Sequence, residues 1–383
     1  MKRNRLFFGL LVLLVLLALG VYAQHEHPFN FRHFAQDFQR ADWRLVALGV
    51  GCIYLGFVLR ALRWALLLRA NKRVAPLALL GAQVIGYTGV ALIGRLADLT
   101  RPWLAARKTG LPISSQLAVY VVERLFDLGA MALLFSTAIL FGGSSLPHPE
   151  IFRKVGIWSM AATLAGAVFL LLIRVSGGLV ASFFQKTLGV ISSSLAHAVA
   201  DKIRSFRTGL NTLRTWADFI GALALSVAMW LLIAAAYILT TRSFVDPPLH
   251  SLTLSQGMVL MASSGVASAV QLPVVGWFTQ IGIVAGLLVR FFGADPESAT
   301  ACAATLLAVT FVSILPVGLV WAQVEHIDLR KIADESSHVR EADAVPPRTS
   351  TYPTHSDHDP AGAAPDPSQP VDSLQQPPTH RLQ

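Results

Sequence analysis

Apolar residues along this 383-residue chain gather in long runs, which shorter polar and basic segments separate. An α-helix needs about 20 mostly apolar residues to cross the hydrocarbon layer of a membrane. Six runs come close to that length and predict full spans: Leu6–Ala23, Leu45–Leu68, Ser115–Phe141, Val155–Ile173, Trp216–Leu239 and Thr300–Trp321. The pattern therefore predicts an all-α, polytopic integral membrane helical bundle.

Two further apolar stretches are predicted to be re-entrant helical hairpins. Residues 76–94 precede a basic segment that would lie outside if the run crossed, although Lys and Arg normally stay in cytoplasmic loops. Residues 252–292 are broken at Pro273, so neither half spans convincingly alone. Broken helices in corresponding places of two halves point to a transport site near the midplane. We expect six full spans plus two hairpins, with one hairpin entering from each side.

The ends of the chain and one internal segment differ from the apolar runs. Residues 1–23 have a basic start, and we favour a retained first span over a cleaved signal peptide. Residues 174–214 mix basic and apolar positions, which predicts an amphipathic cytoplasmic segment on the membrane surface. Residues 332–383 are rich in proline and poor in aromatic residues, which predicts a disordered cytoplasmic tail after a transmembrane domain of residues 1–331.

Composition supports a membrane protein and narrows the partners. Hydrophobic residues make up 54% of the chain and charged residues 14%, against about 25% charged in an average soluble domain. The net charge of +9 is explained by basic cytoplasmic loops, so no nucleic-acid partner is expected. Cys52 and Cys302 lie in apolar runs without metal-type spacing, and we expect no metal and no cofactor. The expected location is a bacterial inner membrane, with both termini cytoplasmic.

Charged side chains inside the apolar runs carry the chemistry, because each costs roughly 2.5 kcal/mol or more at the bilayer centre. Arg60 and Arg63 share one helix face, and Glu123 and Asp127 share another. At 1.5 Å per residue, Arg60 and Glu123 would lie about 13 and about 12 Å from their cytoplasmic helix ends. Two explanations remain open: a structural ion pair with an arginine reaching the head groups, or a wet cationic cavity open to the cytoplasm.

A second group of charges follows the first hairpin, with Arg95, Asp98 and Arg101 three residues apart. Guanidinium groups bind phosphate through two parallel hydrogen bonds. We therefore expect arginines from separate segments, among them Arg63, to converge on one anionic lipid head group at the cytoplasmic mouth. The candidate substrate-binding residues are Arg60, Arg63, Arg95, Asp98, Arg101, Glu123, Arg124, Asp127 and Gln280.

Three blocks carry a family resemblance: Arg60-Ala61-Leu62-Arg63-Trp64, Leu92-Ile93-Gly94-Arg95-Leu96-Ala97-Asp98-Leu99-Thr100-Arg101-Pro102 and Val121-Val122-Glu123-Arg124-Leu125-Phe126-Asp127. A weaker fourth block is Pro273-Val274-Val275-Gly276-Trp277-Phe278-Thr279-Gln280. Together they resemble the flippase-like membrane region of the lysylphosphatidylglycerol synthases and its stand-alone relatives. The resemblance implies an integral membrane protein that moves, or helps to move, lipid-linked material between leaflets.

The chain also departs from that family. The family usually has Pro-Ala-Arg-x-Gly-Glu where this chain has residues 93–98, so the acid is kept as Asp98 and the glycine is lost. The family often carries a Glu near the position of Gln280. After Lys331 only the predicted tail follows, so the resemblance does not imply the soluble aminoacyl-transfer activity of the synthases.

Three functions remain as hypotheses. The first is translocation of a phospholipid or lipid-linked anionic substrate. The second is a membrane enzyme that transfers a group to a lipid head group, with Glu123 or Asp127 as acid or base. The third is a non-catalytic anchor that holds an enzyme through residues 174–214. We favour the first and expect no catalytic residues, because no nucleotide loop, metal-ligand cluster or nucleophile motif is visible in the chain.

Overall fold

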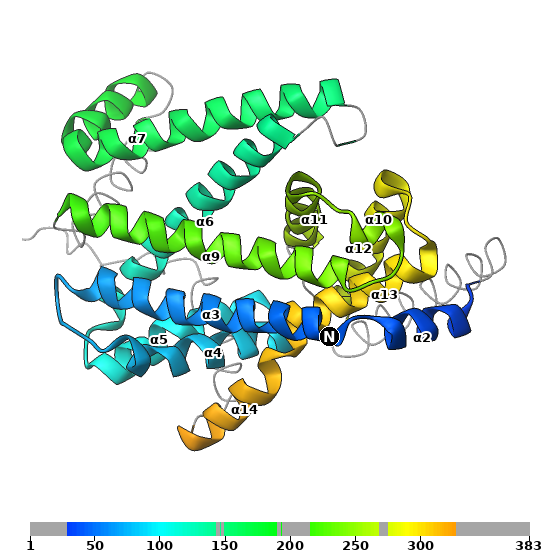
Figure 1. Ribbon diagram of the computed structural model, residues 1–383. Coiled ribbons are helices and arrows are strands. Elements are labelled where there is room, and N and C mark those ends of the chain that lie inside the picture. The colour runs from blue at the N-terminus through cyan, green and yellow to red at the C-terminus, as the bar shows by residue number, and fades with distance from the viewer. Residues whose placement is uncertain are drawn as a thin grey trace, which may run out of the picture. The chain divides into compact units, whose positions relative to one another are not determined.

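The computed structural model describes residues 29–142, 146, 149–189, 193, 215–267 and 275–326, and these residues form helices without a strand (Figure 1). The elements are α2 (Phe31–Arg40), α3 (Trp43–Leu68), α4 (Pro76–Ile93), η1 (Arg95–Leu99), α5 (Thr100–Thr109), α6 (Ile113–Gly142), α7 (Pro149–Gly189), α9 (Trp216–Arg242), α10 (Pro247–His250), α11 (Leu254–Ala267), α12 (Val275–Phe292), α13 (Pro296–Leu307), η4 (Ala308–Val312) and α14 (Ile314–Val324). The predicted all-α class is confirmed for this part of the chain.

Four helical segments in the described residues are long and apolar enough to cross a membrane. They are Trp43–Leu68, Ile113–Gly142, Trp216–Arg242 and Pro296–Val324. The last combines α13 and α14 through η4, a short π-helical turn. Each contains a run that the sequence predicted as a span, so the protein is a multi-pass membrane protein. The predicted total of six spans is not reached in this part of the chain.

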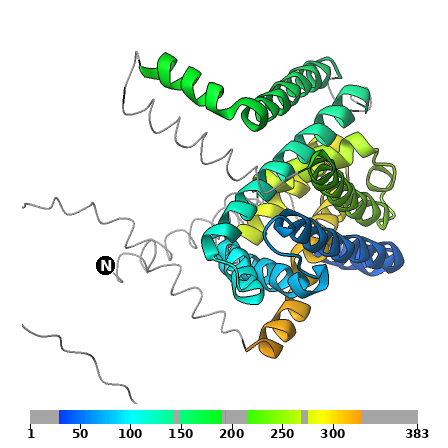
Figure 2. The same cartoon turned by 90° about the vertical axis from the view of Figure 1, so that its left-hand side faces the viewer.

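The remaining predicted spans have different outcomes. Residues 6–23 and the tail from 332 onward lie outside the described residues, and so does most of 190–214. Residues 155–173 fall inside α7, a helix of 41 residues that bends at Ser176 and is not one of the four spans. This helix packs on α6, as two views show (Figure 1, Figure 2).

The most extensive helix–helix contact of the described part runs where α3 lies along α9 (Figure 1). Small residues allow this close approach: a Cβ added to Gly49 would lie only 3.2 Å from the Thr240 hydroxyl oxygen. Close backbone approach through small residues is how membrane helices gain packing energy, since lipid tails are as apolar as the helix surfaces. This pairing fixes the α3 face that carries Arg60 and Arg63.

Two pairs of shorter helices complete the described part. The first is α4 with α5, joined by the 3₁₀ turn η1, and the chain reverses at Gly94, whose φ is +98°. The second is α11 with α12, whose connection at 268–274 lies outside the described residues. Apolar segments of α4 and α12 are shorter than the four spans. The α11–α12 pair occurs where the sequence predicted the second hairpin. Residues 76–94, predicted as the first hairpin, instead form the single helix α4, and its partner α5 follows in the basic segment. Whether either pair is re-entrant stays a prediction.

Candidate functional site

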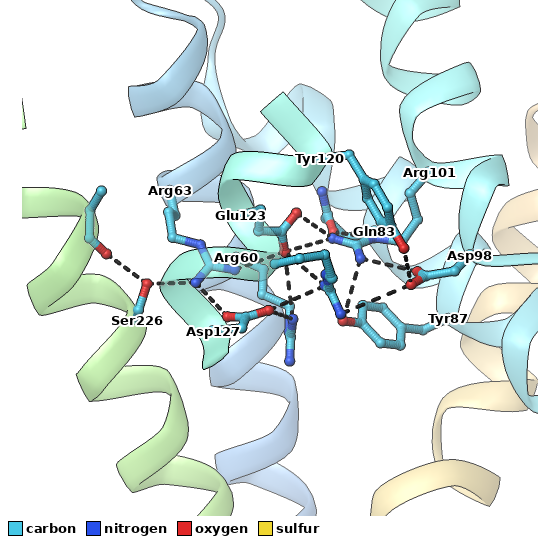
Figure 3. A network of polar contacts seen from close by, with 12 residues as sticks. Arg60, Arg63, Gln83, Tyr87, Asp98, Arg101, Tyr120, Glu123, Asp127 and Ser226 are labelled. Carbon is cyan, nitrogen blue, oxygen red and sulfur yellow. Dashed lines mark hydrogen bonds and ion pairs between the residues drawn. The ribbon is translucent and has the colours of Figure 1, made fainter. Parts of the chain in front are cut away.

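A buried ion-pair cluster forms where α3 faces α6 (Figure 3). Arg63 donates to Glu123 at 2.8 Å and to Asp127 at 2.6 Å, and its guanidinium also reaches the Ser226 hydroxyl of α9 at 2.6 Å. Arg60 lies one turn away, with its Nη1 3.6 Å from Glu123 and 3.5 Å from Asp127. The charged faces of α3 and α6, which lie at similar distances from their helix ends in the sequence, therefore contact each other.

Arg101 brings a second segment into the cluster. Its Nη2 lies 2.7 Å from both carboxylate oxygens of Glu123, its Nε donates to Gln83 at 2.9 Å, and its Nη1 donates to Asp98 at 3.1 Å. The side chain is fully buried, and its stem lies on α4 at Gly86, where an added Cβ would collide with it. Glycine at this position lets the arginine cross from α5 to α6.

Arg124 is the most exposed arginine of the cluster. Its side chain keeps 34% of its surface exposed, against 10% or less for Arg60, Arg63 and Arg101. It makes ion pairs of 3.2 Å with Asp127 and 3.3 Å with Glu123. Among the four arginines of the described cluster, Arg124 therefore has the most accessible side chain.

Aromatic rings cover the guanidinium groups. The Tyr87 ring lies 4.8 Å from the Arg60 guanidinium carbon and 4.7 Å from that of Arg101. The Tyr120 ring lies 5.3 Å from that of Arg124, and its hydroxyl donates to Asp98 at 2.6 Å. Ring faces attract cations, so these contacts stabilise the arginines without cancelling their charge.

The described cluster has more positive than negative charge. Its four guanidinium groups belong to Arg60, Arg63, Arg101 and Arg124, and its three carboxylates belong to Asp98, Glu123 and Asp127. One positive charge is thus unmatched. The buried Nε atoms of Arg63 and Arg124 also lack a hydrogen-bond partner within the described part of the chain.

Asp98 lies at the edge of the cluster, and its carboxyl group is negatively charged. Burial alone would raise the pKa of its carboxyl, but the Arg101 and Arg124 charges and the Tyr120 hydroxyl together hold that pKa below its usual range. Asp98 is therefore an anion at neutral pH, and it counts fully in the charge balance.

The remaining candidates lie elsewhere or cannot be described. Arg95 belongs to η1, but its side chain lies outside the described ones. Gln280 is on α12 and donates to Ser264 of α11 at 2.7 Å, and no described contact joins it to the cluster. Arg63 and Arg101 do converge, on the buried carboxylate of Glu123. A desolvated arginine must be paired, which explains this contact. Their convergence on a lipid head group at a cytoplasmic mouth stays a prediction.

Sequence reasoning missed the polar residues that α4 contributes. Gln83 and Tyr87 stand four residues apart, on one face of an otherwise apolar helix, and both contact Arg101. That spacing was the available signal. Ser226 carried no comparable signal, because serine hydroxyls in membrane helices commonly bond their own backbone, as Ser226 does with Ala222. Tyr120 was missed although it stands three residues before Glu123 on the same helix.

The fold and site together define a multi-pass, helical membrane protein with a buried, net cationic cluster built from α3, α5, α6 and η1. The family described as the lysylphosphatidylglycerol synthase TM region matches residues 6–318, and the chain belongs to this family. No curated protein matches the chain.

Proposed function

We propose that the protein translocates, or assists the translocation of, a phospholipid or lipid-linked anionic substrate between membrane leaflets. The observation that carries the proposal is the unmatched positive charge of the cluster, whose most exposed member is Arg124. An uncompensated charge inside an apolar bundle is costly and tends to be kept for function.

Charge balance favours a phosphodiester head group. The phosphodiester of phosphatidylglycerol carries one net negative charge and would neutralise the cluster, whereas in phosphatidylcholine the choline cation cancels that charge. Arg124 would donate to a phosphate oxygen, as arginine does in charge-assisted, paired hydrogen bonds. The tails would stay in the apolar surroundings of the helices while the head group moves.

The contacts of Glu123 weigh against the rival hypothesis of a group-transfer enzyme. A general base needs a free lone pair within reach of its substrate. Glu123 is almost fully buried, and both of its oxygens accept hydrogen bonds from Arg101, one of them also from Arg63, so a substrate would reach a lone pair only by displacing an arginine. We therefore assign Glu123 to holding the arginines in place. An anchoring role through residues 174–214 has no described contact that favours it.

Translocation in proteoliposomes tests the proposal. Tail-labelled phosphatidylglycerol, with phosphatidylcholine as the zwitterionic comparison, would be followed by quenching of the outer leaflet. We expect the wild type to move phosphatidylglycerol and Arg124→Gln to slow it about tenfold or more, which corresponds to one lost charge-assisted hydrogen bond.

Arg290→Gln is the matched control, because Arg290 is an exposed arginine in the last turn of α12. It should leave the rate unchanged. Equal rates for wild type and protein-free vesicles, or for wild type and Arg124→Gln, would contradict the proposal.

A further inference from the structure

A second polar cluster lies where α2 meets the start of α13, well away from the arginine cluster along α3. The His33 ring stands between two carboxylates: its Nε2 lies 3.7 Å from Asp37, and its Nδ1 lies 3.8 Å from Asp295. The ligand atoms of His33, Asp295 and Glu297 all lie within 4.8 Å of one another. Three side chains that commonly bind metals thus point at one small space.

Hydrogen bonds fix the carboxylates around this space. Ser298 donates through its hydroxyl to Asp37 at 2.6 Å, and Asp295 caps α13 by accepting from the Ser298 backbone at 3.2 Å. Glu297 accepts from the backbone N–H of Asn30 at 2.9 Å. Each carboxylate keeps further lone pairs that these bonds do not use.

The two sides of the imidazole have different roles. If Nε2 carries the proton and faces Asp37, Nδ1 presents a lone pair to the Asp295 carboxylate. Two acceptors then face each other with no donor between them. A ligating histidine typically directs its other ring nitrogen to a carboxylate in this way, which fixes the tautomer that binds the metal.

The cluster lacks a basic counterion in the described part of the chain. Asp37, Asp295 and Glu297 lie within ion-pair distance of no described lysine or arginine. A fourth carboxylate, on Asp246, accepts from the Asp295 backbone at 3.3 Å and adds to the negative charge. The missing positive charge is what a bound cation would supply.

We propose that His33, Asp295 and Glu297 bind a divalent transition-metal ion of the zinc or manganese class, with Asp37 orienting the imidazole. An imidazole ligand favours these ions over Ca²⁺ and Mg²⁺, which prefer oxygen ligands alone. Three protein ligands leave an open position for water. The side chain of His33 is 46% exposed, so an ion can enter from solvent.

The ion would fasten two distant parts of the chain. Asn30 and Glu297, already joined by a hydrogen bond, are 267 positions apart. An ion that binds only the folded chain raises the free energy of unfolding. The increase grows with the logarithm of the ratio of ion concentration to dissociation constant. The site would therefore lock α2, and with it the entry into α3, against the start of α13.

The test uses the full-length chain in detergent, purified with a tag that contains no histidine and stripped of metal. Zn²⁺, Mn²⁺ and Ca²⁺ alone are titrated by calorimetry, and the midpoint of thermal unfolding is followed in parallel. We expect one site that binds Zn²⁺ or Mn²⁺ at least tenfold more tightly than Ca²⁺ and raises the midpoint.

Variants distinguish this site from other histidines of the chain. His33→Ala and Glu297→Gln should each lose the site and the rise in midpoint, and Asp37→Asn should weaken binding by about 10-fold to 100-fold. His250→Ala is the control, because His250 is an exposed histidine that contacts the Arg242 carbonyl instead. Retention of the same site by folded His33→Ala and Glu297→Gln would overturn the proposal. So would the absence of a binding site in the wild type.

Discussion

The buried arginines of this bundle need acidic partners, and Glu123 is the acidic residue that pairs with most of them. Its carboxylate joins arginines from three helices: Arg63 of α3, Arg101 of α5 and Arg124 of α6. All four side chains lie on described helices, and three of them are almost fully buried. Removing one partner of a buried ion pair is more costly than the pair itself is worth, because a charge is left desolvated.

Glu123→Ala should therefore lower the free energy of unfolding by about 3–5 kcal/mol. Denaturant titration of the purified protein in detergent measures this. Glu150→Ala, which removes an exposed acid at the start of α7, should stay within about 0.5 kcal/mol of wild type. Equal stability of Glu123→Ala and wild type would show that water enters the cluster and screens the arginines.

Sequence reasoning named every charged residue of the described cluster as a candidate, but it missed the uncharged members and the pairing of the charges. Charges within apolar runs are conspicuous, so Arg60, Arg63, Glu123 and Asp127 were predicted from helix spacing alone. Which oxygen meets which nitrogen depends on how α5 crosses α4, and no spacing encodes that. The His33 site was invisible for the same reason, since Asp37 and Ser298 are 261 positions apart.

At the scale of helices, the contact between α4 and α5 depends on one glycine. Gly86 leaves room for the stem of Arg101, and a methyl group there would overlap its Cγ. Gly86→Ala should cost about 1–3 kcal/mol of stability and displace the guanidinium from Glu123. Thermal unfolding compares it with Gly129→Ala on α6, where the added Cβ meets nothing within 4 Å. If both variants behave alike, Arg101 is held less tightly than its contacts indicate.

A second prediction at this scale concerns the side of the membrane on which the α4–α5 pair begins and ends. The charge pattern predicts that the pair enters and leaves on the cytoplasmic side. In a background with Cys52 and Cys302 replaced by alanine, Lys108→Cys should stay unlabelled by an impermeant thiol reagent added to intact cells. Ser251→Cys, in the exposed turn after α10, should be labelled. Labelling of Lys108→Cys from outside would show that α4 crosses.

The sequence predicted the positions of the helices more closely than it predicted the number of membrane spans. The runs at 45–68 and 216–239 lie within α3 and α9 almost residue for residue, because length and hydropathy fix a span. The π-helical turn η4 inside the last span was not predicted. Such turns depend on local packing, here including the Tyr54 hydroxyl donating to the Ser313 carbonyl at 2.8 Å.

For the whole molecule, the described helices and the family assignment agree on a multi-pass membrane protein of the lysylphosphatidylglycerol synthase TM region. Composition alone predicted the membrane class, because so apolar a chain cannot cover itself with polar surface. The substrate cannot be derived that way. Our proposal for the substrate rests on the one unmatched charge of the described cluster and on the exposure of Arg124.

Native mass spectrometry of the purified protein with phosphatidylglycerol and phosphatidylcholine tests this central claim most directly. Wild type and the control Arg290→Gln should retain phosphatidylglycerol in preference to phosphatidylcholine. Arg124→Gln should lose that preference while its thermal midpoint stays near that of wild type, because Arg124 is the least buried arginine of the cluster. Undiminished preference for phosphatidylglycerol in a folded Arg124→Gln variant would contradict the account.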